Sequence, residues 1–174
     1  KDPRFLLESA KKFQGNFATI DNALKINNKM PKYISNSLQN SIKKLGLKKS
    51  ILVSGLSYKS NVEDMRDSAS FKVINELVSS GYQVFGYDPF FREEIIKKYL
   101  IENNLNEINF ELVDNLNDSI LERISCICIV QHHDITFEQI NEIYKKSKVP
   151  LIYDCQNKIK NDSNSKTILD CLGN

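Results

Sequence analysis

The sequence predicts a three-layer α/β fold, in which a parallel five-stranded sheet follows an α-helical segment. From residue 48 onward, short apolar runs alternate with stretches of helical periodicity, the pattern of strands joined by helical crossovers. The run at 126–130 is almost uniformly apolar, as expected for a strand buried on both faces of a parallel sheet. The first 46 residues show helical spacing and no strand signal. We therefore expect a helical segment at 1–46 and an α/β domain at 47–174.

The chain opens at a helix-start signal, with Asp2 as the N-cap residue and Pro3 at the first helical position. It begins with Lys1 rather than methionine. From these two observations we expect the sequence to be a piece of a longer protein.

Two helices are expected in the first segment. A short one covers 3–14, and a long one covers 17–45, where apolar residues recur at spacings of three and four. Proline removes an internal hydrogen bond from a helix, so we expect Pro31 to kink the long helix. Glycines at 15 and 46 mark the two helix ends.

The α/β domain is predicted from five apolar runs, each bounded by turn residues. Strands are expected at 51–56, 82–87, 108–113, 126–130 and 151–155, and helices at 68–79, 91–102, 117–123 and 137–146. The polar stretch at 158–166 is expected to be a loop, and 168–172 to add a helical turn. Strands that alternate with helices predict a parallel sheet with right-handed crossovers.

Composition argues against several classes of protein. The net charge is +2 and the lysines are scattered among acids, so the basic stripe of a nucleic-acid-binding protein is missing. No apolar run approaches the about 18 residues of a membrane span, and no signal peptide is recognisable. The four cysteines have the spacing of neither a disulfide framework nor a zinc ribbon. We expect a reducing, cytoplasmic setting and neither nucleic acid nor membrane as a partner.

The turn after the first strand, residues 55–68, is the most informative stretch. In open α/β sheets, ligands bind beyond the carboxyl ends of the strands. A dinucleotide fingerprint would place three glycines in this turn, which has Gly55 alone. It carries instead the aromatic Tyr58 and the cations Lys59 and Arg66. Two long cations can neutralise a pyrophosphate without a glycine cradle, so the turn predicts a phosphate-bearing ligand held by side chains.

Polar residues also follow the second strand. Asp88 stands where a dinucleotide-binding fold places the acid that holds the adenosine ribose. The Asp88-Pro89 pair is also an ordinary strand-stopping turn, and the glycine-poor first turn favours that interpretation.

Histidines and a cysteine follow the fourth and fifth strands. His132 and His133 are adjacent and therefore point to opposite faces of a strand, so they cannot share one metal ion without a bend. We expect no metal site, although one crevice-facing histidine could contact a ligand. Cys155 would need an activating neighbour to act as a catalytic thiol, and a structural role is favoured.

These residues together resemble a known family, the UDP-glucose/GDP-mannose dehydrogenases, which includes dehydrogenases of N-acetylated UDP-sugars. The resemblance is carried by Gly-x-x-Tyr-Lys…Asp-x-Arg-x-Ser in residues 55–68, by Gly-Tyr-x-Val…Tyr-Asp-Pro in 81–89 and by Asp-x-x-Asn in 154–157. It extends upstream to Lys-Asp-Pro-Arg-Phe-Leu in 1–6 and to Ile-Asn-Asn-x-Met-Pro in 26–31. Nearly the whole chain is covered.

The resemblance implies an activity and a domain order. Enzymes of this family oxidise the C6 hydroxyl of a nucleotide sugar to a carboxylate in two NAD-dependent hydride transfers, through a thiohemiacetal and a thioester on a cysteine. An NAD-binding Rossmann domain comes first, a central helical dimerisation region second, and a Rossmann-like domain that binds the nucleotide sugar third. This chain resembles part of the second and all of the third, so we expect a homodimer formed through the long helix.

The resemblance also assigns roles to residues. Tyr58 and Lys59 would contact the UDP-sugar, and Arg66 would lie at the interdomain cleft, near the phosphates of cofactor or substrate. Asp2 would be the acid that orients water, and Lys1 the adjacent active-site lysine.

Two departures from the family pattern limit these expectations. The catalytic cysteine, expected three residues before Lys1, and any NAD fingerprint are absent, so NAD would be bound mainly by the missing N-terminal domain and this chain alone should be inactive. Gln156 stands where many members have arginine. Two alternatives stay open: a stand-alone dinucleotide-binding module that uses Asp88, and a non-catalytic dimerisation module.

Overall fold

A computed structural model describes residues 2–12, 17–105, 108 and 110–173. The described residues form a parallel six-stranded sheet in the order β3-β2-β1-β4-β5-β6. The strands are β1 (Ser50–Ser54), β2 (Gln83–Tyr87), β3 (Glu111–Leu112), β4 (Cys126–Ile129), β5 (Leu151–Asp154) and β6 (Ile168–Cys171). The helices are α1 (Asp2–Lys12), α2 (Ala18–Lys44), α3 (Ala69–Ser79), α4 (Glu93–Glu102), α5 (Asp118–Arg123) and α6 (Asp134–Lys145).

The strand order places a topological switch point between β1 and β4. From β1 the chain adds β2 and then β3 on one side, and it then crosses over to add β4, β5 and β6 on the other. In such doubly wound sheets the loops after the two central strands diverge, and ligands bind in the crevice between them. Here these loops are the β1–α3 loop and the β4–α6 loop.

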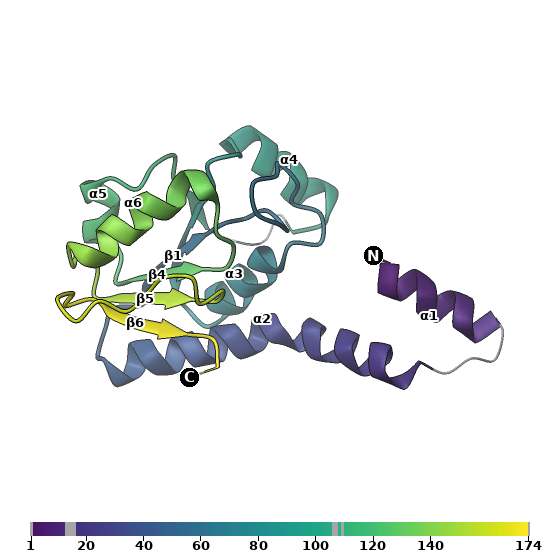
Figure 1. The fold of residues 1–174 in the computed structure, drawn as a ribbon. Helices are drawn as coiled ribbons and strands as arrows, with labels where there is room; N and C mark the ends of the chain where they lie inside the picture. Colours follow the sequence, from purple (N-terminus) through teal and green to yellow (C-terminus); the bar gives the residue numbers. More distant parts are fainter. Residues whose placement is uncertain (1, 13–16, 106–107, 109, 174) are drawn as a thin grey trace.

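Helices cover both faces of the sheet, giving the expected three layers (Figure 1). Side chains alternate between the faces along each strand, because successive residues of a strand point in opposite directions. Ile51 and Val53 of β1 pack with residues of α2, α3 and α4, whereas Leu52 packs with residues of α5 and α6. All five residues of β1 are buried, as expected for a central strand of a parallel sheet.

The long helix α2 belongs partly to the sheet domain. Its second half contributes Ile34, Leu38 and Ile42, all at most 5% exposed, to the core on the α3 side of the sheet. Its first half extends beyond the sheet domain, with α1 alongside it (Figure 1). Pro31 lies within the helix, which continues through it.

The structure corrects several predicted elements. The sheet has six strands rather than five, because 168–171 forms a strand and not a helical turn. These residues pair in parallel with β5 at the edge of the sheet. They form a strand because of this pairing and not because of their own short sequence pattern. Among the described residues of the strand predicted at 108–113, only those of β3 are in a strand, and α6 begins at Asp134, three residues earlier than expected. The predicted end of the first helix lies outside the described residues.

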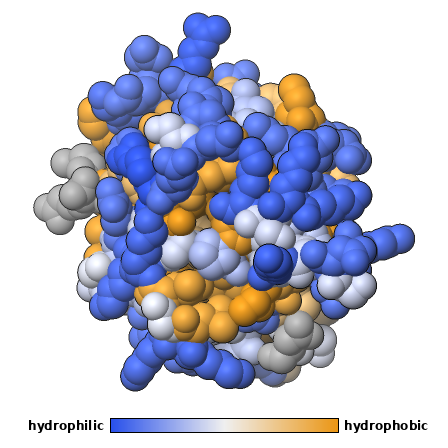
Figure 2. Space-filling model, turned by 90° about the vertical axis from the view of Figure 1, so that its left-hand side faces the viewer, coloured by the Kyte–Doolittle hydropathy of each residue, from blue (hydrophilic) through white to orange (hydrophobic). Residues whose placement is uncertain are grey.

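None of the described helices is both long and apolar enough to cross a membrane. Figure 2 shows the end of the molecule at the left of Figure 1, where hydrophobic residues gather in the middle of the face and hydrophilic ones surround them. The strands point away from this end, so the loops at the switch point lie on the other side (Figure 1).

Candidate functional site

The two switch-point loops touch each other at Gly55. This residue has φ of +84°, and a Cβ built on it would lie 2.0 Å from the carbonyl oxygen of Gln131 in the β4–α6 loop. Its N–H donates to the carbonyl of Tyr87 at the end of β2. A glycine is therefore required here by both the backbone conformation and the close approach of a second backbone. The contact brings the β1–α3 loop directly over the end of the sheet.

Asp88 fixes the start of the β1–α3 loop. Its carboxylate is 3% exposed, and its Oδ2 atom accepts hydrogen bonds from the N–H groups of Leu56 (2.7 Å) and Ser57 (3.1 Å). Its Oδ1 accepts from the N–H of Phe90 at 3.0 Å. His133 contributes a further contact, with Nε2 3.0 Å from Oδ2. Both oxygens are thus engaged within the protein, which matches a structural role and leaves no free oxygen for a ribose.

The pKa of Asp88 reflects these contacts. Burial acts to raise the pKa, but hydrogen bonds from His133 and from the backbone N–H groups of Phe90 and Leu56 act against it, and the net direction is below the ordinary carboxyl value. Asp88 is therefore held as an anion that organises the loop above it.

His133 links the same loop to the rest of the crevice. It is 1% exposed, and its Nδ1 accepts the N–H of Asn61 at 3.0 Å. Its Nε2 lies 3.0 Å from Asp88 Oδ2 and 3.2 Å from the Ser57 hydroxyl. Because Nδ1 is an acceptor, the proton of the neutral ring is on Nε2, where it can be donated to either oxygen.

Two further contacts hold the loop from outside. The Asn61 side chain donates to the Asp134 carboxylate (2.7 Å) and accepts from the Asp134 N–H (2.9 Å). The Gln131 amide donates to the Ser60 hydroxyl at 2.6 Å. Side-chain hydrogen bonds therefore join the β1–α3 loop to the β4–α6 loop and to the first residue of α6.

The cations predicted to bind phosphate lie on the outer face of this loop. Tyr58 is 51% exposed and Lys59 is also exposed. A backbone hydrogen bond from the N–H of Tyr58 to the carbonyl of Asp64 (2.9 Å) brings the two ends of the segment 58–64 together. Lys59 and Arg66 are therefore attached to backbone close to this hydrogen bond. Within the part of the chain that the structure describes, the Lys59 ammonium has no hydrogen-bond or ion-pair partner.

Arg66 differs from Lys59 because it already has an anionic partner. Its guanidinium donates to both oxygens of Asp64, with Nε–Oδ1 at 2.9 Å and Nη2–Oδ2 at 2.6 Å. The side chain is 71% exposed, and the hydrogen bond to Asp64 raises the pKa of Arg66. A phosphate would have to share Arg66 with Asp64, whereas Lys59 is directly available.

The other predicted site residues lie elsewhere. Lys1 and the side chain of Asp2 are outside the described part of the structure. His132 is buried, as His133 is, and its Nε2 lies 3.0 Å from Asp154 at the end of β5. Each histidine therefore pairs with an aspartate: His132 with Asp154 on the adjacent strand β5, and His133 with Asp88, which follows β2 on the far side of β1. Gln156 is half-buried beside the His132–Asp154 pair, and its side-chain oxygen accepts the backbone N–H of His132 at 3.4 Å.

Cysteines and metal ligands do not converge at the crevice. In the described ranges, no group of three or more His, Cys, Asp or Glu side chains is placed to hold a metal ion. Cys126 and Cys128 are buried within β4 and Cys155 is half-buried; all three are free thiols. A hydrogen bond with Cys155 and burial raise the pKa of Cys128, which keeps that thiol protonated.

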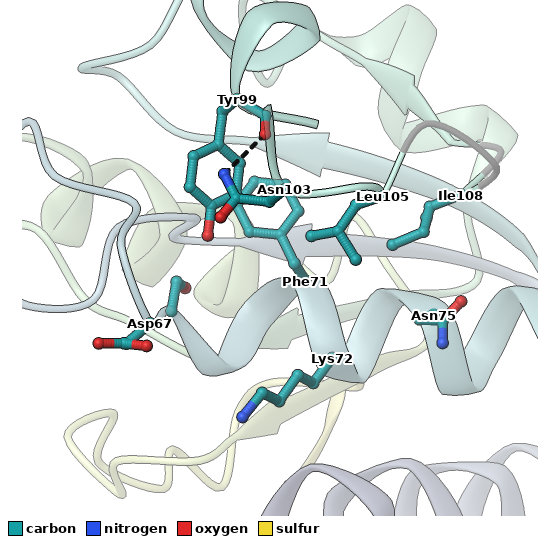
Figure 3. A pocket seen from close by; sticks show the side chains of 9 residues that line it. Asp67, Phe71, Lys72, Asn75, Tyr99, Asn103, Leu105 and Ile108 are labelled. Atoms are coloured by element: carbon teal, nitrogen blue, oxygen red, sulfur yellow. Dashed lines mark hydrogen bonds between the residues drawn. The ribbon is translucent and has the colours of Figure 1, made fainter. Parts of the chain in front are cut away.

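A pocket of about 230 Å³ lies beside the end of the loop (Figure 3). Its aromatic wall is formed by Phe71 and Tyr99, whose ring centroids are 5.1 Å apart. The other described lining residues are Asp67, Ser68, Lys72, Asn75, Asn103, Leu105 and Ile108. Of these described residues only Lys72 is cationic, so the pocket lacks the paired cations expected around a diphosphate.

Sequence reasoning missed the residues that hold the loop. Ser57, Asn61 and Gln131 are ordinary polar residues of turns, and nothing in their local sequence indicates a partner 70 residues away. His133 and Asp88 did carry a signal: each follows a strand next to β1, so the strand order predicts that they meet. The residues that contact each other at the switch point therefore mainly hold the β1–α3 loop in place. The exposed Tyr58, Lys59 and Arg66 remain the candidates for ligand contact.

Together, the strand order and the glycine-poor switch point define a Rossmann-like α/β domain. Comparison with known proteins agrees. The UDP binding domain of the UDP-glucose/GDP-mannose dehydrogenase family matches residues 52–161, more than half of the chain. The chain belongs to this family and corresponds to its C-terminal part, which confirms the resemblance noted in the sequence.

Individual relatives point the same way. UDP-N-acetyl-D-mannosamine dehydrogenases from Methanococcus vannielii and Methanococcus maripaludis are 34% and 32% identical, over 90% of this chain and 33% of each relative. The chain thus spans about a third of the length of the curated relatives it matches. The fold is shared with GDP-mannose dehydrogenase from Pseudomonas aeruginosa, with a TM-score of 0.72 and 15% identity over 98% of this chain and 37% of that one. UDP-D-ManNAc dehydrogenase from Pyrococcus horikoshii has a TM-score of 0.70 and is 23% identical, over 98% of this chain and 36% of that one.

Proposed function

We propose that this chain is the UDP-sugar-binding part of an NAD-dependent nucleotide-sugar 6-dehydrogenase, which oxidises the C6 hydroxyl of a UDP-sugar to a uronate. The observation that carries the proposal is the exposed ammonium of Lys59, which has no partner among the described residues and lies on a loop that hydrogen bonds hold at the switch point. The family match to a UDP binding domain supports it. Lys59 would hold the diphosphate, Tyr58 would contact the nucleotide sugar, and Arg66 would add a second cation shared with Asp64.

The residues of this chain do not fit the role of an NAD site. The β1–α3 turn has one glycine, and Asp88, the residue at the ribose-binding position, has both oxygens occupied by protein donors. NAD and the nucleophilic cysteine would therefore belong to a preceding NAD-binding domain, and this chain alone would be inactive. At its junction with that domain, Lys1 and Asp2 would contribute the active-site lysine and the acid that orients water.

Calorimetry with nucleotides tests this assignment. UDP is expected to bind the chain, more weakly as salt is added because the contact is ionic, and to raise the melting temperature. Lys59→Ala should weaken UDP binding by about 1–3 kcal/mol, the value of a charge-assisted hydrogen bond. Lys145→Ala, at the far end of α6, is the matched control and should bind as the unmodified chain does. Binding of NAD without binding of UDP would overturn the assignment.

The helical segment at 1–46 would supply a homodimer interface and form part of the central region of the full enzyme. Support comes from large apolar side chains left exposed on the projecting helices: Phe5, Phe17 and Ile26 are 64%, 44% and 63% exposed. Replacing both Phe17 and Ile26 by serine should shift the chain from dimer to monomer in light scattering, without loss of the folded core, because neither residue is buried. An unchanged mass for the double variant would count against this interface.

The setting would be cytoplasmic and reducing, in keeping with free thiols at Cys126, Cys128, Cys155 and Cys171.

A further inference from the structure

The imidazole of His133 contacts three residues at the switch point. Its Nδ1 accepts the N–H of Asn61, two residues after Lys59. Its Nε2 faces both Asp88 and the hydroxyl of Ser57, two residues before Lys59. The Ser57 hydroxyl in turn donates to the carbonyl of Lys59 at 3.0 Å. One buried ring therefore braces the backbone on both sides of the exposed lysine.

We propose that His133 is the positioning residue of the phosphate-binding loop, and that it acts as a neutral imidazole through its Nδ1 bond to Asn61. This inference rests on the proposed function, because it assigns the loop's rigidity to the binding of the diphosphate. His133 is buried behind the loop and does not touch the ligand. Its role is to remove freedom from the segment 57–61, so that the flexible side chain of Lys59 starts from a fixed backbone.

The need for a fixed backbone is visible at Asn61. This residue has φ of +58°, in the left-handed region that asparagine adopts more readily than most residues other than glycine, and contacts to both its backbone and its side chain hold it there. Its N–H is bound by His133 and its side chain by Asp134. Protonation of Nδ1, or its removal, would leave the Asn61 N–H without an acceptor and release this anchor.

Two substitutions separate positioning from simple support of the fold. In His133→Asn, the amide oxygen can take the place of Nδ1 and accept the Asn61 N–H, but nothing reaches Asp88. In His133→Gln, the longer amide can reach Asp88, but no acceptor stands at the Nδ1 position. If His133 positions the loop, nucleotide affinity should be kept in the variant that provides an acceptor for the Asn61 backbone N–H and lost in the variant that does not, independently of the change in stability.

The measurement is the affinity for a UDP-sugar by calorimetry, with urea unfolding of each variant in parallel. A UDP-sugar is the probe because the terminal phosphate of UDP would lose a second proton with a pKa of about 6. In a UDP-sugar each phosphorus carries one ester and one anhydride bond, so the charge of the diphosphate stays constant near neutral pH. His133→Asn should bind within about threefold of the unmodified chain, and His133→Gln about tenfold more weakly, which is the order of one lost hydrogen bond. His132→Asn is the matched control: it breaks the contact to Asp154 but touches no residue of the loop, so its affinity should be unchanged.

Two results would overturn the proposal: equal affinity in His133→Asn and His133→Gln, or affinity losses in all three histidine variants that simply follow their losses in stability. Because a buried substitution can unfold the chain, Asn61→Gly checks the proposal at an exposed residue. Glycine suits the positive φ and keeps the backbone N–H that His133 accepts, although both side-chain bonds to Asp134 are lost. Affinity should therefore fall less than in His133→Gln, and an equal fall would count against His133 as the positioning residue.

Nuclear magnetic resonance keeps this test independent of the proposed function. The nitrogen chemical shifts of the His133 ring should place its proton on Nε2. The backbone N–H of Asn61 should exchange slowly with solvent in the unmodified chain and in His133→Asn, but rapidly in His133→Gln. A fast-exchanging Asn61 amide in the unmodified chain would refute the anchor. A chain with a protected amide that binds no UDP-sugar would instead refute the proposed function.

Discussion

Replacing Gly55 by alanine is expected to destabilise the chain by at least about 3 kcal/mol, because a left-handed backbone alone costs an L-residue about 1–2 kcal/mol and a backbone collision adds to it. The new Cβ would lie 2.0 Å from the carbonyl oxygen of Gln131. The neighbour is backbone and cannot rotate away, so β1 or the β4–α6 loop would have to move. Urea unfolding measures the change.

Gly81 provides the matched control. It too has a positive φ, +78°, but a Cβ there would meet nothing within 4 Å. Gly81→Ala should therefore lower the free energy of unfolding by only about 1–2 kcal/mol, the cost of the left-handed backbone conformation. Equal losses for the two variants would mean that the close approach of the two loops is not what requires glycine at residue 55.

Replacing Asp88 by alanine is expected to cost about 3–5 kcal/mol of stability, the usual effect of removing one partner from a buried, hydrogen-bonded ionic group. The N–H groups of Leu56, Ser57 and Phe90 would lose their side-chain acceptor, and the Nε2 of His133 would be left with the Ser57 hydroxyl alone. Asp114→Ala, at an exposed aspartate, should change the free energy of unfolding by less than about 0.5 kcal/mol. A small effect at Asp88 would show that water readily replaces the carboxylate.

The same carboxylate should make stability depend on acid pH. The folded-state pKa of Asp88 is lowered from the ordinary 3.8, so its contribution is fully present above that value and is lost as the pH falls through the lowered pKa. Asp154 is shifted in the same direction: burial raises its pKa, and hydrogen bonds from His132 and from backbone N–H groups outweigh this effect. Asp88→Asn should therefore show a weaker, though not abolished, loss of stability between neutral and acid pH.

Much of the fold could be predicted because the central strands carry their own signal. β1 and β4 are buried on both faces and read as continuous apolar runs, whereas β6 is an edge strand in which only part of the surface is buried. Such a strand is specified by its neighbour β5 rather than by its own residues, and its short pattern alone predicts a helical turn.

The exposed candidate residues could be proposed from the sequence, whereas the residues that hold their loop in place could not. The cations at 59 and 66 stand out because they replace glycines in a known position of the fold. The links from Asn61 to His133 and from Ser60 to Gln131 join residues more than 70 positions apart. They depend on a switch point that exists only after β4 has paired with β1.

A crystal of the chain grown or soaked with UDP tests the central claim most directly, because it shows where the diphosphate lies. We expect phosphate oxygens within about 3 Å of the Lys59 ammonium, at the normal distance of a charge-assisted hydrogen bond, with Arg66 beside them. Diphosphate density elsewhere on the molecule, with Lys59 still directed into solvent, would contradict the account.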